Sequence, residues 1–393
     1  MKRILILGGS HFQIPFIERA KANGLYVITC DYLPDNPGHA LAHEYHDVST
    51  TDREAVAALA RRLAVDAVAT FASDPSVPAV AHTCDLLGLP GPTYAAILAL
   101  TDKDRFRELM RRSGLNVPEF ATVTGTEPLE GFRDAAAYIV KPVDSSGSKG
   151  VTRSTGTIGR LSAAVEYAMR FSRAKRCIIE EYIDGPQIHG DGFLVGGKLV
   201  NHYLGDQFFF TTTNSFIPIS TRWPSRFPQS VIDEVVRQVE VIASSSGYLV
   251  GPVNIEARVN GAMDVYVIEV GPRNGGNYVP VIQQRLTGFD YVDAALRLAL
   301  GEPLDVRPGS SRSIGAQFIL HADRAGTFAE VVIDPALQDH VFYTKRFLEL
   351  GDPVSEYRGS NAVVGVLLLE FSDAPERDRI MSQADELIRV IVT

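Results

Sequence analysis

The stretch GPVNIEARVNGAMDVYVIEVGPRNGG, residues 251–276, decides how this sequence is interpreted. Two runs, 251–259 and 264–270, have the alternating pattern of β-strands and flank Asn260-Gly261, a dipeptide typical of hairpin turns. A turn centred on this dipeptide puts Glu256 and Glu269 on one face of the hairpin. That polar face also carries Asn254 and Arg258, whereas the core face is predicted to hold Val253, Ile255, Ala257, Val259, Tyr266, Ile268 and Val270.

The two glutamates predict a metal site. Carboxylates that are opposite or diagonal on a hairpin, about 5 to 8 Å apart, repel each other unless a cation lies between them. Mg²⁺ prefers oxygen ligands and often binds one or two carboxylates together with substrate phosphates. The alternative is a solvated hairpin face on which Glu256 and Glu269 pair with Arg258 or Arg273.

A second stretch, KPVDSSGSKGV at 141–151, has the composition of an anion-binding loop. Lys141 ends an apolar strand, and glycine, serine and lysine follow it, which is the reverse of the order in a P-loop. Backbone N–H groups of residues 146–150 can surround phosphate oxygens, a role that requires glycine. A plain surface loop is the alternative.

The rest of the chain predicts an α/β region followed by an α+β region. Strands and helices alternate up to about residue 100, which predicts a parallel sheet, and Ser73 and Asp74 follow its strand 65–72 at the edge where such sheets bind ligands. Thr101 is expected to cap a helix that contains Lys103. A helix is predicted to end the chain, over 374–392.

Composition excludes several classes of protein. A chain of 393 residues that is 45% hydrophobic is expected to form two or three domains. Its net charge of −9 argues against a nucleic-acid partner, and its apolar runs are too short to span a membrane, so we expect a cytoplasmic protein. Cys30, Cys84 and Cys177 are far apart in the sequence and are expected to be buried thiols.

Lys103, Lys141, the SSGSKG loop, EEYIDG at 180–185, Glu256 and Glu269 follow one another in an order that resembles the ATP-grasp superfamily. This superfamily of carboxylate-amine ligases includes biotin carboxylase, the D-alanine ligases and the L-amino-acid ligases. The resemblance covers essentially the whole chain. It implies an N-terminal parallel α/β (pre-ATP-grasp) domain over 1–100, followed by a two-subdomain ATP-grasp fold. The small subdomain with its glycine-loop lid is expected over 101–185, and the large and C-terminal subdomain over 186–393.

The resemblance also implies roles for individual residues. Arg273 and Lys141 are expected to be catalytic, and the metal ligands are expected among Glu256, Glu269, Asn254 and Asn274. Two substitutions depart from the pattern: Gln187 stands where many relatives have a ribose-binding glutamate, and Gly271 where an asparagine is common. ATP contacts are expected from Lys103, Lys141, Ser146, Gly147, Ser148, Lys149, Gly150, Glu180, Glu181, Tyr182, Ile183 and Gln187, and substrate contacts from Ser73, Asp74, Arg273, Gly275 and Gly276.

The implied activity is ATP-dependent ligation of a small carboxylate to an amine through an acylphosphate. The cofactors would be ATP and Mg²⁺, with Mn²⁺ as an alternative ion. The oligomeric state is open, and a homodimer is the commonest expectation. Two other functions are open at this point. One is a kinase of the same superfamily that phosphorylates an amide or a hydroxyl, and the other is a non-catalytic or redox nucleotide-binding protein.

Overall fold

The computed structural model describes residues 1–125, 129, 131–132, 137–155, 158–210, 216–304, 306, 312–359 and 362–393. The strands in these ranges form sheets of four, nine, three and four strands. The first sheet is parallel and the others are antiparallel, so the predicted succession of α/β and α+β structure is confirmed.

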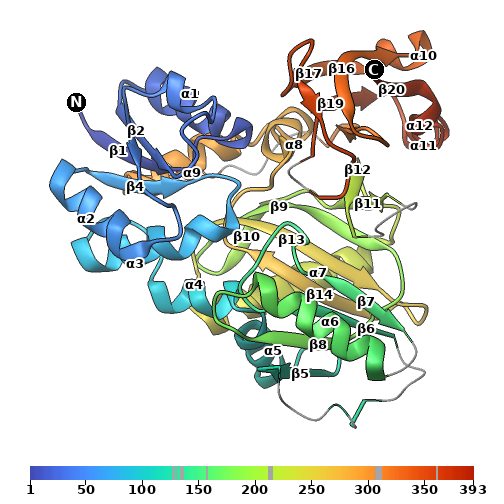
Figure 1. Ribbon diagram of the computed structural model, residues 1–393, viewed down its shortest axis with the longest axis horizontal. Coiled ribbons are helices and arrows are strands. Elements are labelled where there is room, and N and C mark those ends of the chain that lie inside the picture. Colours follow the sequence, from blue (N-terminus) through green and yellow to red (C-terminus); the bar gives the residue numbers. More distant parts are fainter. Residues whose placement is uncertain are drawn as a thin grey trace.

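The N-terminal sheet has the strand order β3-β2-β1-β4. Alternation along β1 turns Ile4 and Ile6 to one face and Leu5 and Leu7 to the other. Helices α2 and α3 cover the second face, and α1 covers the first together with α9, which comes from the other end of the sequence (Figure 1). The bounds are β1 (Arg3–Leu7), α1 (Ile14–Ala22), β2 (Tyr26–Asp31), β3 (Glu44–Asp47), α2 (Arg53–Leu63), β4 (Ala67–Thr70), α3 (Val77–Leu87) and α9 (Tyr291–Ala299), with short 3₁₀ turns at His11–Gln13, His39–Leu41 and Asp74–Ser76.

Two helices, α4 (Tyr94–Thr101) and α5 (Lys103–Arg112), connect this sheet to the rest of the chain. Asp102 is the N-cap of α5, and Thr101 is the last residue of α4. The prediction that Thr101 caps the second helix was therefore wrong, because its hydroxyl donates back to the carbonyl of Ile97 at 2.9 Å. Lys103 is the first residue of α5.

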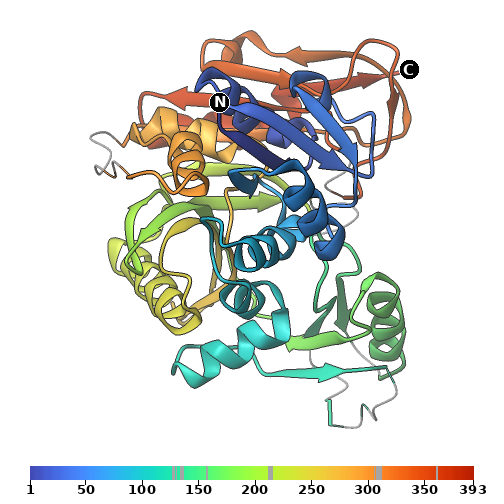
Figure 2. The ribbon, with the colours of Figure 1, turned by 90° about the vertical axis from the view of Figure 1, so that its left-hand side faces the viewer.

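A small antiparallel sheet, β5-β8-β6-β7, carries the glycine loop. Helix α6 packs on one face of it through Val165 and Ala168, which contact Val140 and Ile179 of the central strands. Figure 2 shows this unit, in green, projecting from the remainder of the molecule. Its elements are β5 (Phe120–Val123), β6 (Ala137–Pro142), β7 (Thr152–Thr155), α6 (Ile158–Phe171) and β8 (Cys177–Glu181).

The large sheet has the order β14-β13-β9-β11-β12-β15-β19-β17, with β10 paired to β9. Its β13–β14 end is covered by α7 and by α4 and α5, which together bury the largest apolar cluster of the chain. The elements are β9 (Gln187–Val195), β10 (Lys198–His202), β11 (Gly205–Phe209), β12 (Pro218–Trp223), α7 (Gln229–Ser246), β13 (Gly251–Val259), β14 (Val265–Gly271), α8 (Val279–Thr287), β15 (Ile314–Leu320), β17 (Val341–Arg346) and β19 (Gly365–Phe371).

The C-terminal region adds the sheet β18-β16-β20 beside β15 and β19. The expected final helix over 374–392 was wrong in its last five residues, because Ile388–Val392 is strand β20 and pairs with β16. Branched residues in IRVIV favour this extended conformation. The remaining elements are β16 (Gly326–Ile333), α10 (Pro335–Gln338), β18 (Pro353–Val354), α11 (Ala374–Met381) and α12 (Ala384–Leu387).

The sequence also led to expectations about the three cysteines and about membrane-spanning segments. Cys30, Cys84 and Cys177 are buried, as predicted. In the described part of the chain, none of the helices combines the length and the apolar character that a membrane span requires.

Candidate active site

Glu256 on β13 and Glu269 on β14 are direct partners in the antiparallel pairing of these strands. The sequence predicted this juxtaposition with a turn centred on Asn260 and Gly261, and that position of the turn was wrong. The loop consists of the five residues 260–264, between Val259 and Val265. An odd loop alone would move Glu269 to the core face, but a β-bulge adds Ile268 to β14 and restores the register.

The five-residue loop and the bulge together change which residues of β14 reach the core. Val265, Val267 and Val270 are buried in the largest apolar cluster. Tyr266 and Ile268, which were predicted to be core residues, are only partly buried. The core face of β13 is as predicted, since Val253, Ile255, Ala257 and Val259 all belong to that cluster.

The surroundings of Glu256 disfavour its negative charge. Burial raises the pKa of Glu256, and the carboxylate of Glu269 raises it further, to about 7. The Nε2 of Gln187 donates to Glu256 Oε2 at 3.0 Å, which satisfies one oxygen without adding positive charge. A cation between the two carboxylates would remove the repulsion.

Strand β9 extends the polar face of β13. Its residues Gln187, His189 and Asp191 are in register with Arg258, Glu256 and Asn254, respectively. Sequence analysis missed His189 and Asp191, although polar residues at every second position of QIHGD were a usable signal for a strand with one polar face.

His189 and Asp191 are linked through Asn254. The Nδ2 of Asn254 lies 3.0 Å from His189 Nε2 and 2.8 Å from Asp191 Oδ1. The other ring nitrogen of His189, Nδ1, lies 3.1 Å from Thr221 Oγ1 on β12. Burial, together with the charge of Arg273, lowers the pKa of His189 to about 3, so this imidazole is neutral. Burial raises the pKa of Asp191 to about 6, although hydrogen bonds from Gly275 and Asn254 act against the rise.

The loop after β14 carries Arg273 to the N-terminal sheet. Its Nε and Nη2 donate to the two carboxylate oxygens of Asp74, at 2.5 and 2.7 Å. Burial would lower the pKa of Arg273, but the carboxylates of Asp74 and Glu269 outweigh it and raise the pKa. The structure therefore brings together one predicted substrate residue and one predicted catalytic residue that are far apart in the sequence. The hydroxyl of the other candidate, Ser73, instead contacts Ser76 Oγ at 2.8 Å.

Glycines in this loop allow the close approach. The backbone N–H of Gly275 donates to both oxygens of Asp191, at 3.0 and 2.8 Å, and a Cβ at Gly275 would lie 2.7 Å from Asp191 Oδ1. A Cβ at Gly271 would lie 3.2 Å from Asp74 Oδ1. No such crowding exists at Gly276, where a Cβ would meet nothing within 4 Å. Asn274 is almost fully buried.

Lys141 is held in a buried ionic cluster on the opposite side of the site. Its Nζ lies 2.6 Å from Glu180 Oε2, and Arg107 Nε lies 2.8 Å from Glu180 Oε1. Burial would raise the pKa of Glu180, but the charges of Arg107 and Lys141 hold it at about 2. Arg107 also donates to the carbonyl of Ile268 at 2.9 Å, so the cluster joins the small sheet to β14. Both oxygens of Glu180 are thus engaged within the chain.

The other candidate ATP residues lie around this cluster. Lys103 Nζ donates to the carbonyl of Ser145 at 2.6 Å, at the base of the glycine loop. Glu181 is exposed at the end of β8. Beyond it, Arg258 donates to Tyr182 Oη at 2.9 Å and to the carbonyl of Ile183 at 3.1 Å.

Some of these groups line a pocket. It lies between the N-terminal sheet, the start of α5, the base of the glycine loop and the end of β14. Among the residues that line it are Asp74, Lys103, Arg107, Asp144, Ser145, Ser146, Arg173, Ile268, Glu269, Gly271 and Pro272. Cationic and anionic side chains thus face one cavity. Within the described ranges, no cluster of three or more His, Cys, Asp or Glu residues is placed to hold a metal ion, so any cation would rest on the glutamate pair and on neutral oxygens.

Residues 135–281 match the ATP-grasp domain family. The chain contains an ATP-grasp domain. The match spans both the glycine loop and the Glu256–Glu269 pair. The resemblance seen in the sequence is therefore confirmed.

The comparisons with known proteins extend over most of the chain. Formate-dependent phosphoribosylglycinamide formyltransferase of Paraburkholderia xenovorans is 27% identical over 349 residues, which cover 84% of this chain and 82% of that protein. The crystal structure of L-amino acid ligase from Bacillus licheniformis is similar with a TM-score of 0.79 and 21% identity, covering 100% of this chain and 99% of that one.

A third similar protein was solved with nucleotide bound. The biotin carboxylase domain dimer of 2-oxoglutarate carboxylase from Hydrogenobacter thermophilus, solved with MgADP, ADP and bicarbonate, has a TM-score of 0.75 and 17% identity. It covers 100% of this chain and 91% of that one. These likenesses establish that the whole chain has the fold of ATP-grasp proteins, including the parallel N-terminal sheet.

Proposed function

We propose that this protein is an ATP-dependent ligase that joins a small carboxylate to an amine through an acylphosphate. The observation that carries the proposal is a pocket lined by Asp74, Lys103 and Glu269, in a chain whose residues 135–281 match an ATP-grasp domain. Asp74 binds Arg273, and Glu269 is the strand partner of Glu256. The similarity to L-amino acid ligase and to a formate-dependent formyltransferase supports a carboxylate as the phosphate acceptor.

The proposed reaction has two steps. A carboxylate oxygen bonds to the γ-phosphorus of ATP while the bond from that phosphorus to the β,γ-bridging oxygen breaks, which releases ADP. The amine nitrogen then bonds to the acyl carbon, the bond from that carbon to the phosphate oxygen breaks, and the nitrogen loses a proton. No protein nucleophile is required, because positioning and charge stabilisation provide the catalysis.

The residues divide into three groups in this proposal. Lys103 and Lys141 bind phosphate oxygens, and the N–H groups of Ser146, Gly147, Ser148, Lys149 and Gly150 cover them. The backbone of Glu181, Tyr182 and Ile183 faces adenine, and Gln187 faces ribose. Arg273, oriented by Asp74, stabilises the charge on the transferring phosphoryl group, and Gly275 lets its loop approach.

The donor set fits a hard divalent cation. Glu256 and Glu269 are strand partners and offer carboxylate oxygens, and the pKa of Glu256 is raised. The neighbouring Asn254 and Asn274 offer amide oxygens. Mg²⁺ and Mn²⁺ bind such all-oxygen ligand sets. The bound ion would neutralise phosphate charge, and Glu256 and Glu269 would hold it.

We further propose a cytoplasmic location, because the reaction depends on ATP. The proposed assembly is a homodimer. The proposed domain bounds are 1–100, 101–185 and 186–393.

The test is an ADP-release assay with amino acids and small carboxylates, supplied singly and in pairs. A ligase releases ADP with one carboxylate–amine pair and forms a stoichiometric amide product. Stable phosphorylated product without any amine would indicate the kinase alternative instead. If nucleotide binds but no substrate across a broad panel causes turnover, the ligase proposal is wrong.

A further inference from the structure

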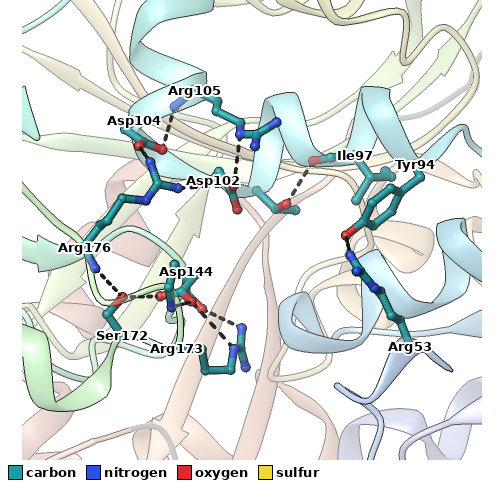
Figure 3. Close-up of polar contacts among 12 residues, drawn as sticks. Arg53, Tyr94, Ile97, Asp102, Asp104, Arg105, Asp144, Ser172, Arg173 and Arg176 are labelled. Atoms are coloured by element: carbon teal, nitrogen blue, oxygen red, sulfur yellow. Dashed lines mark hydrogen bonds and ion pairs between the residues drawn. The ribbon is translucent and has the colours of Figure 1, made fainter. Parts of the chain in front are cut away.

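Asp144 forms an anchor two residues after β6, where the glycine loop begins. Its Oδ1 accepts a hydrogen bond from Ser172 Oγ at 2.9 Å, and its Oδ2 accepts one from the backbone N–H of Ala174 at 2.8 Å. The guanidinium of Arg173 donates to the main-chain carbonyl of Asp144 at 2.6 Å (Figure 3). Residues 172–174, in the turn between α6 and β8, thus make three hydrogen bonds to Asp144.

Helix α5 holds the same segment from another direction. The backbone N–H of Lys103 donates to the carbonyl of Val143 at 3.0 Å, and its Nζ donates to the carbonyl of Ser145 at 2.6 Å. The two holding elements are themselves joined, because Arg176 pairs with Asp104 of α5 (Figure 3). Residues 143–145 are therefore fixed between α5 and the 172–176 turn.

Residues 146–150, which follow this base, differ from it in backbone conformation. Gly147, Ser148 and Gly150 have φ values of +64°, +59° and +75°, which is the left-handed backbone conformation. Ser148 Oγ donates to the carbonyl of Phe216, two residues before β12, at 3.1 Å. The position that residues 146–150 take over a ligand therefore depends on the direction in which the chain leaves residues 143–145.

The anchor borders the active-site pocket. Asp144, Ser145 and Arg173 line the same cavity as Lys103 and Glu269. A shift of the base would move both the loop N–H groups and the carbonyl that holds the Lys103 ammonium. We propose that Asp144 is a positioning residue, which fixes the base of the glycine loop and thereby sets the place of Lys103 and of the loop relative to nucleotide phosphates.

A carboxylate is needed at this position because both of its oxygens receive donors. An asparagine could still accept from the Ala174 N–H, but its NH₂ group would then face Ser172 Oγ, which already accepts from the Arg176 N–H at 3.1 Å. The bond that the Ser172 hydroxyl donates to Asp144 would be lost. The neighbouring Arg173, whose Nε lies 3.8 Å from Asp144 Oδ2, would also lose its counter-charge. The inference rests on the proposed function for the identity of the ligand, whereas the anchoring itself can be tested without nucleotide.

The test compares Asp144→Asn with the wild type in two measurements. Hydrogen exchange of amides 146–150 in the ligand-free protein should be at least about threefold faster in the variant, while exchange in β9 and β13 is unchanged. The Kd for a fluorescent ADP analogue with Mg²⁺ should rise about tenfold. Asp334→Asn is the matched control, since Asp334 Oδ1 also accepts a backbone N–H, from Ala336 at 2.9 Å, but caps the distant α10. The control should change neither quantity.

Ser172→Ala removes one donor to Asp144 and keeps the charge, so it should produce a smaller change in the same direction. It replaces Asp144→Asn if that variant does not fold. Unchanged loop exchange, or faster exchange with an unchanged Kd, would overturn the role of Asp144. A wild-type protein that binds no nucleotide would instead overturn the proposed function, and the exchange comparison would still show whether Asp144 holds the loop.

Discussion

Glu256 lies directly opposite Glu269 across two antiparallel strands, although the loop between those strands has an odd number of residues, 260–264. The bulge at Ile268 is what brings the two carboxylates to one face. An arrangement that places two like charges together without a partner cation costs stability, which is the pattern expected of a binding site.

Neutralising either glutamate should separate activity from stability. Glu256→Gln and Glu269→Gln are expected to lower Mg²⁺-dependent ATP turnover on the order of 100-fold, because a neutral amide cannot offset the charge of the cation. Without metal, both variants should melt at the same temperature as the wild type or higher. Glu370→Gln on β19, where Glu370 pairs with Arg285 at 2.9 Å, is the control and should keep full turnover. Retained activity in both site variants would refute the metal site.

The raised pKa of Glu256 makes the stability of the metal-free protein depend on pH. A carboxyl whose pKa rises from an ordinary value near 4.5 to about 7 on folding binds more protons in the native state. The stability it contributes in metal-free protein is therefore complete below about pH 4.5 and is lost as pH rises through about 7. Glu256→Gln should remove this loss, raising the melting temperature above pH 7 on the order of 2 °C. Thermal melts in chelator from pH 5 to 8.5 check this, and parallel pH curves for variant and wild type would contradict it.

Lys141 should matter for both nucleotide binding and stability. Lys141→Ala is expected to abolish ATP turnover and to destabilise the fold on the order of 2 kcal/mol, because Glu180 loses one of its two buried partners. Arg107 continues to pair with Glu180, so the variant should still fold. The control is Lys198→Ala, which removes an exposed pair with Glu240 at 2.6 Å and should affect neither property. A folded Lys141→Ala protein with wild-type turnover would show that this lysine does not contact phosphate.

The Arg273–Asp74 pair should require a guanidinium. Arg273→Lys keeps the charge but cannot donate to both oxygens of Asp74, so turnover should fall about 10- to 100-fold in a protein that folds normally. Arg285→Lys alters an exposed arginine–glutamate pair and is expected to have no effect. Steady-state ADP release measures both variants, and equal rates would remove Arg273 from the proposed chemistry.

The sequence predicted features that depend on local patterns. The alternation along β13 correctly separated its core face from the face of Glu256. What it could not predict depends on contacts between distant segments. Arg107 is one of several arginines in α5, and only the tertiary structure reveals that its partner is Glu180, 73 residues away.

Three further misses each concern a single strand. Tyr266 and Ile268 were assigned to the core because the turn was predicted at Asn260-Gly261, whereas the five-residue loop 260–264 turns both side chains away from it. In β9, the polar face of Gln187, His189 and Asp191 was visible as alternation but gained meaning only beside β13. The C-terminal strand β20 was taken for helix because it follows two short helices directly.

The central claim is that phosphate passes from ATP to a carboxylate, and oxygen labelling tests it most directly. With the first carboxylate–amine pair that releases ADP, the carboxylate is supplied with ¹⁸O in both oxygens, and the phosphate formed is examined by ³¹P NMR. Ligation through an acylphosphate predicts one ¹⁸O atom in each phosphate, transferred from the carboxylate. Phosphate that contains no label, while ADP and amide accumulate, would contradict the account.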